Sequence, residues 1–210
     1  LMETTIGPDR LKEDIARYSI DGLVPDVVAV PQNVHDVEKA MEAAWHQDLA
    51  VAPRGGGTRI HIGNVPERLD VMLDISRLNR VVSHNAGDLT ATVEAGITLT
   101  SLQKTLAEHG QFLAIDSPLP DRATVGGTLA SLASGPMRWQ YSHPRDLVIG
   151  LKVVQADGTS TKSGGEVVKN VSGYDMARLH IGAFGTLGII TEVSFKLTPL
   201  PHRQTTMIGY

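Results

Sequence analysis

Three glycine-rich segments, each set among strand and helix signals, constrain this chain more than any other feature. They are PRGGGT at 53–58, TVGGT at 124–128, and the stretch 182–188, which holds three glycines and precedes an apolar run. Glycines remove side chains, so several backbone N–H groups can converge on one anion and form a nest for phosphate oxygens. The first segment alone fits a flexible connection between strands equally well. Three such segments in one chain favour a ligand site built from loops.

The spacing of the glycines argues against two common nucleotide-binding motifs. No Gly-Lys-Ser/Thr follows PRGGGT, so it is not a Walker loop and nucleoside triphosphate hydrolysis is disfavoured. The spacing GxGxxG of dinucleotide-binding folds is absent from it as well. TVGGT continues into small residues at 130–135, which would let backbone approach a pyrophosphate closely. Close packing of a helix is the alternative reason for small residues there.

The first part of the chain predicts a parallel strand–helix–strand unit. DVVAV at 26–30 is typical of a short buried strand, and apolar residues at spacings of three and four over 34–45 predict a helix. Asn33 is the expected N-cap of that helix. A second strand is expected at 49–52, and because a helix separates the two strands, we predict a right-handed parallel crossover.

Further strands are predicted at 69–75, 78–82 and 89–93, and we expect them to extend the same sheet. Thr98 then caps a predicted helix that runs through residue 108, and Gly110 closes it in the position that favours glycine. These elements complete a first structural unit.

The second half of the chain begins with a segment rich in Pro, Gly, Ser and Thr at 112–135, which predicts a loop wrapped around a ligand. Strands at 146–155 and 159–161 are expected to form a hairpin, because the Asp-Gly turn between them readily takes positive φ angles. A short helix is predicted at 174–180 and a long final strand at 186–197.

Composition narrows the classes of partner. With 41% hydrophobic residues and a formal net charge of -4, the chain is globular and is not built to bind nucleic acid or an anionic membrane. It has no Cys, which excludes disulfides, thiolate catalysis and Cys-ligated metals, and we expect no metal centre. No signal peptide and no apolar run long enough to span a membrane is visible, so we expect a cytoplasmic location.

The order and content of the loops resemble a known family. The motifs that carry the resemblance are PRGGGT, DSPLPDRATVGGTLASLASGP, RDLVIGLKVVQADG and GYDMARLHIGAFGTLGIITE. Together they look like the FAD-binding domain of the vanillyl-alcohol oxidase and p-cresol methylhydroxylase type, over roughly residues 25–201. Within that type, GPMRWQ and GGEVVKNVSGYD are most similar to glycolate oxidase FAD-binding subunits.

This resemblance implies an α+β fold with two subdomains, mixed sheets flanked by helices, and an extended FAD held between the subdomains. The implied division of the chain is an N-terminal segment at 1–24, a first subdomain at 25–96, a second at 97–201, and the start of a cap domain or a tail at 202–210. The family's substrate-binding cap domain follows the last strand, so we expect the chain to be a fragment of a longer protein.

The resemblance also implies a set of cofactor-binding residues. The first loop would give backbone donors to the FAD pyrophosphate, the second would line the other side of the cofactor, and the third would pack near its adenosine or ring portions. In that order, the residues are Pro53, Arg54, Gly55, Gly56, Gly57, Thr58 and Arg59; Pro118, Thr124, Gly126, Gly127, Ser131 and Ser134; and Gly185, Thr186, Leu187, Gly188 and Ile190.

Covalent attachment of FAD in this family often uses a His in the first glycine-rich loop. The matching position, just after the third glycine, is Thr58. We therefore expect noncovalent FAD, with His61 as a distant second candidate for attachment. A lone His in a loop is more often a solvated side chain.

The implied activity is oxidation of a small 2-hydroxy acid, such as glycolate or lactate, by a flavin-dependent enzyme. We assign no catalytic base. The polar residues that could face the flavin or an anionic substrate are Arg138, His143, Arg145, Lys169 and Tyr174, although a structural or solvated role is more common for such residues. Asp146 would pair with a neighbouring Arg.

Two alternatives stay open. A UDP-N-acetylmuramate dehydrogenase-like enzyme shares this type of FAD domain, but the chain has no match to its substrate-side motifs. The other is a noncatalytic FAD-binding or electron-transfer subunit that works only with partner subunits of a larger oxidase complex.

Overall fold

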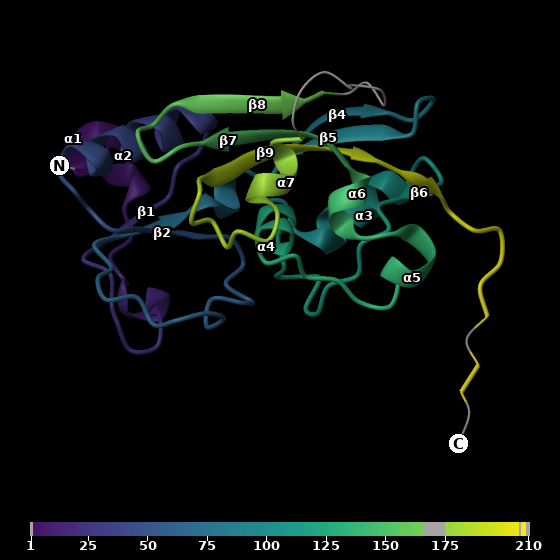
Figure 1. Ribbon diagram of the computed structural model, residues 1–210, viewed down its shortest axis with the longest axis horizontal. Coiled ribbons are helices and arrows are strands. Elements are labelled where there is room, and N and C mark those ends of the chain that lie inside the picture. Colours follow the sequence, from purple (N-terminus) through teal and green to yellow (C-terminus); the bar gives the residue numbers. More distant parts are fainter. Residues whose placement is uncertain (1, 166–174, 206, 209–210) are drawn as a thin grey trace.

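The computed structural model describes residues 2–165, 175–205 and 207–208. Strands and helices form an α+β fold with two main sheets, as expected (Figure 1). The three-stranded sheet contains β1 (Val27–Ala29), β3 (Val71–Asp74) and β2 (Val51–Arg54), in that order. In sheet order, the five-stranded sheet contains β4 (Val81–Asn85), β5 (Thr90–Glu94), β9 (Ile189–Lys196), β7 (Val148–Val154) and β8 (Ser160–Gly164). A small sheet pairs β6 (Gln111–Phe112) with β10 (Thr198–Pro199).

The three-stranded sheet is parallel, which confirms the predicted direction of its first two strands. Helix α2 (Val34–His46) connects β1 to β2, and the Asn33 side chain caps it by accepting a hydrogen bond of 2.9 Å from the Asp36 N–H. The two strands are not neighbours, because β3 lies between them and pairs with both. All four residues of β3 are buried, as expected for a central strand.

The prediction that the strands after β3 extend the first sheet is wrong for β4 and β5, which belong to the five-stranded sheet. The 3₁₀ helix η3 (Ile75–Arg77) turns the chain out of the first sheet, and Asp74 caps it by accepting from the Ser76 N–H at 3.0 Å. The five-stranded sheet is antiparallel throughout. The chain thus changes sheets at η3, whereas the expected subdomain boundary after residue 96 stays a prediction.

Local signals predicted two further elements correctly. Helix α3 (Leu99–Ala107) begins at Thr98, whose hydroxyl accepts a hydrogen bond of 3.2 Å from the Ser101 N–H. Gly110 follows the helix with a φ of 67°. Strands β7 and β8 form the expected hairpin, and Gly158 in its turn has a φ of 85°.

The segment 112–135 is not only a loop, because it contains helix α4 (Val125–Ala130). The hydroxyl of Thr124 caps this helix by accepting from the Gly127 N–H at 3.3 Å. Two adjacent glycines have low helix propensity, so composition favoured a loop. The fully buried Val125 and Leu129 place one side of the helix in the core, and tertiary packing overrides the propensity.

The remaining helices are short. They are α1 (Met2–Ile6), η1 (Pro8–Arg10), η2 (Ala16–Tyr18), α5 (Arg138–Tyr141), α6 (Pro144–Leu147) and α7 (Ala177–His180). The strand expected from residue 146 starts at Val148, because α6 occupies the preceding turn. Part of the segment predicted as a helix at 174–180, including Tyr174, lies outside the described residues. No helix within the described ranges is long and apolar enough to cross a membrane.

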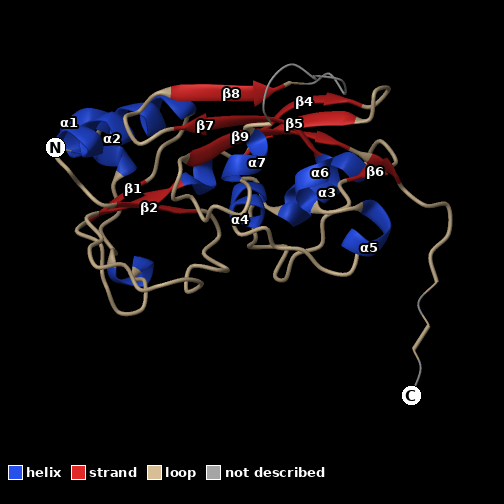
Figure 2. Cartoon of the chain, viewed as in Figure 1, coloured by secondary structure: helices blue, strands red, loops and turns tan. Residues whose placement is uncertain are grey.

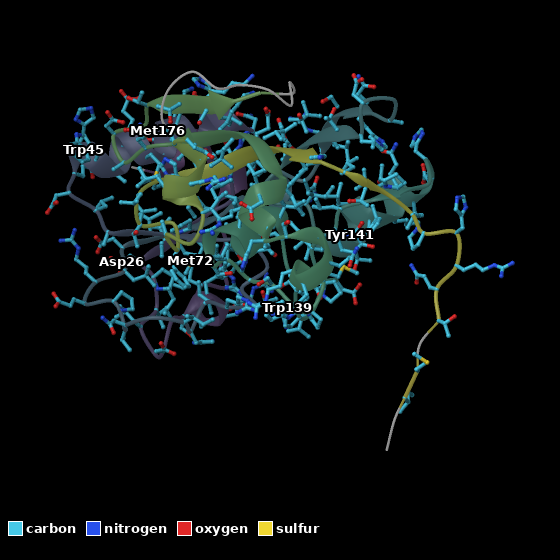
Figure 3. The ribbon with its side chains drawn as sticks, turned by 45° about the vertical axis from the view of Figure 1, so that its right-hand side comes forward. Asp26, Trp45, Met72, Trp139, Tyr141 and Met176 are labelled. Atoms are coloured by element: carbon cyan, nitrogen blue, oxygen red, sulfur yellow. The ribbon has the colours of Figure 1, made fainter. Side chains whose placement is uncertain are left out.

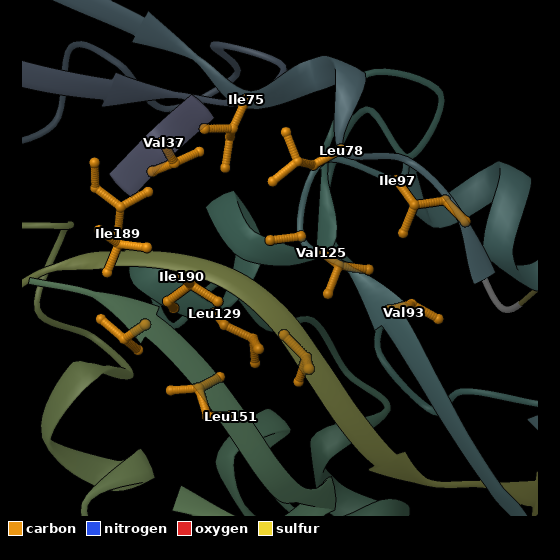
Figure 4. Packing of buried hydrophobic residues seen from close by; sticks show 14 of the residues in the cluster. Val37, Ile75, Leu78, Val93, Ile97, Val125, Leu129, Leu151, Ile189 and Ile190 are labelled. Carbon is orange, nitrogen blue, oxygen red and sulfur yellow. The ribbon is translucent and has the colours of Figure 1, made fainter. Parts of the chain in front are cut away.

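One hydrophobic core serves both main sheets. Val37 from α2, Ile75 from η3, Leu129 from α4 and Ile190 from β9 belong to the same buried cluster (Figure 4). In Figure 2, α3 and α4 lie on one side of the five-stranded sheet. The two sheets and α4 are therefore coupled through apolar packing, so a displacement of α4 disturbs the contacts of both sheets.

His180 is a buried ionisable group that ends α7. Only 9% of it is exposed, and within the described residues its Nδ1 has no hydrogen-bond partner. Burial lowers the pKa of His180 below its usual range, because a low-dielectric environment disfavours the imidazolium ion. The residue is neutral in the folded protein near pH 7.

We predict that acid destabilises the fold through His180. The unfolded chain takes up this proton first, so the free energy of unfolding should fall as pH drops below about 6.5, until the folded-state pKa is reached. Urea denaturation at about pH 7.5 and about pH 5.5 measures this loss. His180→Gln should reduce it, whereas His46→Gln, at an exposed position on α2, should not. Equal pH dependence in the wild type and both variants would contradict the prediction.

Candidate cofactor site

The three glycine-rich segments, which are far apart in the sequence, meet around one cavity. It has a volume of about 60 Å³ and is lined by residues of all three segments, including Gly55, Gly127 and Gly185. A second cavity of about 230 Å³ shares Pro53, Gly185 and Gly188 with the first and extends toward α2. The two cavities adjoin along the third glycine-rich segment.

Glycines bring the loops into direct contact. A Cβ on Gly55 would overlap the Thr124 hydroxyl, and a Cβ on Gly56 would overlap the carbonyl oxygen of Arg122. A Cβ on Gly185 would come within 2.6 Å of Pro53 Cγ. Since real Cβ atoms essentially never approach other atoms so closely, any other residue at these positions would separate the loops.

The first loop offers backbone donors that the rest of the described chain does not use. The backbone N–H groups of residues 55–59 donate no hydrogen bond to another described residue. In the second loop, the Gly126 N–H donates to Ala95 O at 2.7 Å and the Gly127 N–H donates to Thr124 Oγ1 at 3.3 Å. The residues of the first loop are only partly exposed. It is therefore the first loop, rather than the second, that can give N–H groups to an anion.

A cation lies beneath the first loop. The Arg54 guanidinium is 4.5 Å from the centroid of the Tyr18 ring, and a Cβ on Gly57 would come within 2.7 Å of Arg54 Nε. The Tyr18 hydroxyl donates to Asp74 Oδ2 at 2.9 Å, and burial raises the pKa of Tyr18. The ring thus holds Arg54 under the loop, where its positive charge favours an anion. Sequence reasoning missed Tyr18, because its partners come from distant segments.

The third loop is fastened to the end of α4. The N–H groups of Gly182 and Phe184 donate to Leu129 O at 3.0 Å and Ala130 O at 2.8 Å. Phe184 has a φ of 53°, which is rare for a bulky residue, and its half-exposed side chain lines the smaller cavity. Strained backbone of this kind is characteristic of ligand sites.

The cavities contain about half of the predicted cofactor residues. Those that line either cavity are Pro53, Gly55, Gly126, Gly127, Gly185, Thr186, Leu187, Gly188 and Ile190. Those that line neither are Arg54, Gly56, Gly57, Thr58, Arg59, Pro118, Thr124, Ser131 and Ser134.

Several lining residues were not predicted. In the smaller cavity they are Ile75, Ala130, Phe184 and Ile189. Ile189 neighbours a predicted residue on β9 and could have been included. Nothing in the sequence marks Ile75, which reaches the cavity because η3 leaves the first sheet at that point.

The described polar candidates for substrate contact do not line the two cavities. Arg138 stacks over the neighbouring Trp139, which projects from α5 with 83% of its surface exposed (Figure 3). Neither His143 nor Arg145 lines either cavity. Lys169 and Tyr174 lie outside the described residues.

Asp146 and His61 form contacts with other charged residues of the chain. The Asp146 carboxylate forms ion pairs with Arg145 at 3.8 Å, as expected, and with Arg178 at 3.6 Å. His61 is exposed, contacts Asp21 at 2.7 Å and lines neither cavity.

Known proteins are similar to this chain in sequence and in fold. The chain is 32% identical over 211 residues to glycolate oxidase subunit GlcD of Bacillus subtilis, which accounts for 97% of this chain and 45% of that protein. It is 35% identical over 184 residues to the D-2-hydroxyglutarate dehydrogenase of Xanthomonas citri pv. viticola, which accounts for 88% of this chain and 39% of that protein. The chain thus spans less than half of the length of these relatives.

A solved structure of alkyldihydroxyacetonephosphate synthase superposes with a TM-score of 0.80 at 28% identity, over 93% of this chain and 39% of that one. The likeness confirms the expected α+β fold of the p-cresol methylhydroxylase type. Residues 25–164, more than half of the 210 residues, match the FAD binding domain family. The chain therefore belongs to the FAD binding domain family, and FAD is its cofactor.

Proposed function

We propose that the first glycine-rich loop binds the pyrophosphate of FAD through the backbone N–H groups of residues 55–59. The observation that supports this most is that these groups have no acceptor among the described residues, while the N–H groups of Gly126 and Gly127 in the second loop are already paired. A pyrophosphate has two negative charges and needs dense N–H donation in a protein with a net charge of -4. The guanidinium of Arg54 lies under the loop and adds a positive charge.

The second and third loops then serve as walls for the rest of the cofactor. A Cβ on Gly127 would meet only Thr124 Oγ1, at 3.1 Å, so this glycine borders space rather than packed atoms. Gly127 and Ala130 on α4 face the same cavity as Gly185 and Gly188 of the third loop. Small residues at these places allow a flat ring or a ribose to approach the backbone closely.

We further propose that the protein containing this chain oxidises a small 2-hydroxy acid. When bound, FAD supplies the acceptor for the hydride equivalent that such an oxidation releases. The relatives support this choice by their names, since one is a glycolate oxidase subunit and the other a D-2-hydroxyglutarate dehydrogenase. The fold does not decide the reaction, because a synthase shares it. We assign no catalytic base among the described residues.

A second candidate is an FAD-binding or electron-transfer subunit that acts only with partner subunits. The name of the Bacillus relative, which is itself one subunit of an oxidase, favours this reading. Both candidates share the cofactor site, and they differ in whether the chain alone reacts with a hydroxy acid. A cytoplasmic location stays a prediction in either case.

We expect Gly127→Val to weaken FAD binding by more than about tenfold, because its side chain would occupy the cavity. The free energy of unfolding should change little, since no packed backbone opposes the new side chain. Fluorescence titration with FAD and urea denaturation measure the two quantities. Full FAD affinity in this variant would contradict the assignment of Gly127 to the site.

Gly56→Ala is the matched comparison and should behave differently. Its Cβ would overlap the carbonyl oxygen of Arg122, so we expect a loss of about 2 kcal/mol in the free energy of unfolding, through separation of the loops. Unchanged stability would show that the contact between the two loops is looser than this geometry indicates.

We predict that FAD is bound noncovalently, because Thr58 follows the third glycine and has no nucleophilic imidazole. Acid precipitation of the FAD-loaded chain should release the yellow chromophore into the supernatant. Chromophore retained in the pellet would overturn the prediction, and its loss in His61→Ala would then identify His61 as the point of attachment.

Anaerobic addition of glycolate, lactate or 2-hydroxyglutarate to the FAD-loaded chain tests the reaction. Loss of the visible flavin band with one of these acids, and none with the matching acid that lacks the 2-hydroxyl group, would support oxidation by this chain. If no acid reduces the flavin until partner subunits are added, the subunit proposal is correct instead.

A further inference from the structure

A third pocket lies at the carboxyl ends of β1 and β3, beside Arg54 of the first glycine-rich segment. It has a volume of about 310 Å³ and shares no lining residue with the two cavities of the cofactor site. Val30, directly after β1, and Asp74, the last residue of β3, form part of its wall. The N-terminal segment, purple in Figure 1, completes the wall with Lys12 and with Arg17 of η2.

The lining of this pocket is positively charged. Its cations are Lys12, Arg17 and Arg77, and its single carboxylate is Asp74, which leaves two positive charges in excess. Among the described residues, Lys12 and Arg77 form no ion pair. Arg17 pairs with Asp14 at 3.8 Å on the surface, and its guanidinium lies 5.3 Å from the centroid of the Tyr18 ring. The excess is notable in a chain whose net charge is -4.

The single carboxylate is already engaged within the protein. Asp74 Oδ2 accepts from the Tyr18 hydroxyl at 2.9 Å, and Oδ1 accepts from the Ser76 N–H at 3.0 Å. Asp74 also acts on Arg17, since contact with the Tyr18 side chain and, more weakly, the charge of Asp74 raise the pKa of that residue. The Asp74 side chain is only 8% exposed, however, and both of its oxygens are occupied by the Tyr18 and Ser76 donors. The cations thus remain available to a ligand.

The pocket also contains hydrogen-bond donors beside its cations. The hydroxyl of Ser76 and the amide of Asn79 belong to residues that line the pocket beside Arg77. Arginine and hydroxyl groups together suit phosphate oxygens, which accept several charge-assisted hydrogen bonds at once. The carboxyl ends of parallel strands are also a common place for ligands in such sheets.

We propose that this pocket binds the phosphate group of a small molecule, at a position distinct from the FAD site. A phosphate dianion matches the two excess positive charges, and the volume is at the lower end for small-ligand pockets. Tyr18 connects the two sites, since its hydroxyl holds Asp74 in this pocket while its ring carries Arg54 under the first glycine loop.

The test is a titration of the FAD-saturated chain with inorganic phosphate at constant ionic strength, followed by two-dimensional NMR of the backbone amides. Saturation with FAD keeps the glycine loop from binding the probe. We expect saturable shifts at residues 12, 17 and 74–79. Lys12→Gln combined with Arg77→Gln should weaken binding by about tenfold or more, because two charge-assisted contacts are lost.

The matched control is Lys39→Gln combined with Lys104→Gln, which removes the same charge from exposed positions that do not line the pocket. This control should retain wild-type affinity for phosphate. Shifts that grow linearly without saturation, that centre on residues 55–59, or that weaken equally in both double variants would overturn the proposal. Citrate in place of phosphate separates the sources of the anion: equal affinity for citrate would overturn the choice of phosphate.

Discussion

The close contact between the first glycine loop and the segment that precedes α4 is the constraint on which the site depends. Gly55 and Gly56 lie so near Thr124 and Arg122 that no side chain fits between them. This contact joins the loop that follows the parallel sheet to a helix packed on the antiparallel sheet, through one shared core. Because packed interiors do not deform smoothly, the loops are held at a fixed separation.

Hydrogen bonding distinguishes the first and second glycine-rich loops, which look alike in the sequence. Both contain paired glycines, yet the N–H groups of Gly126 and Gly127 are taken by the protein, while those of residues 55–59 have no acceptor among the described residues. An unpaired buried donor costs about 1–3 kcal/mol, so partly exposed donors of this kind are satisfied by water or by an anion. We therefore propose that a ligand phosphate replaces water at the first loop, whereas the second loop contributes shape.

Helix α4 belongs both to the hydrophobic core and to the wall of the cofactor cavity. Val125 and Leu129 are buried in the core, while Gly126, Gly127 and Ala130 line the cavity. Its last carbonyls also hold the third loop in place. Core substitutions near this helix would therefore change the cavity as well as the free energy of unfolding, even where they do not touch the ligand. In the charged pocket beside β1, a different contact orders the wall, namely the hydrogen bond from the Tyr18 hydroxyl to Asp74.

The sequence by itself determined the caps at Asn33 and Thr98, the hairpin of β7 and β8, and the identity of the three glycine-rich loops, and its resemblance to a known family implied the α+β class. The caps and the hairpin depend on signals within a few residues: a capping side chain or a turn that needs positive φ. Only the tertiary structure decided that β4 and β5 leave the first sheet and that a Gly-Gly pair lies in a helix. It alone also placed Tyr18 beneath the first loop. These features arise from hydrogen bonds and packing between segments far apart in the chain, which no local pattern records.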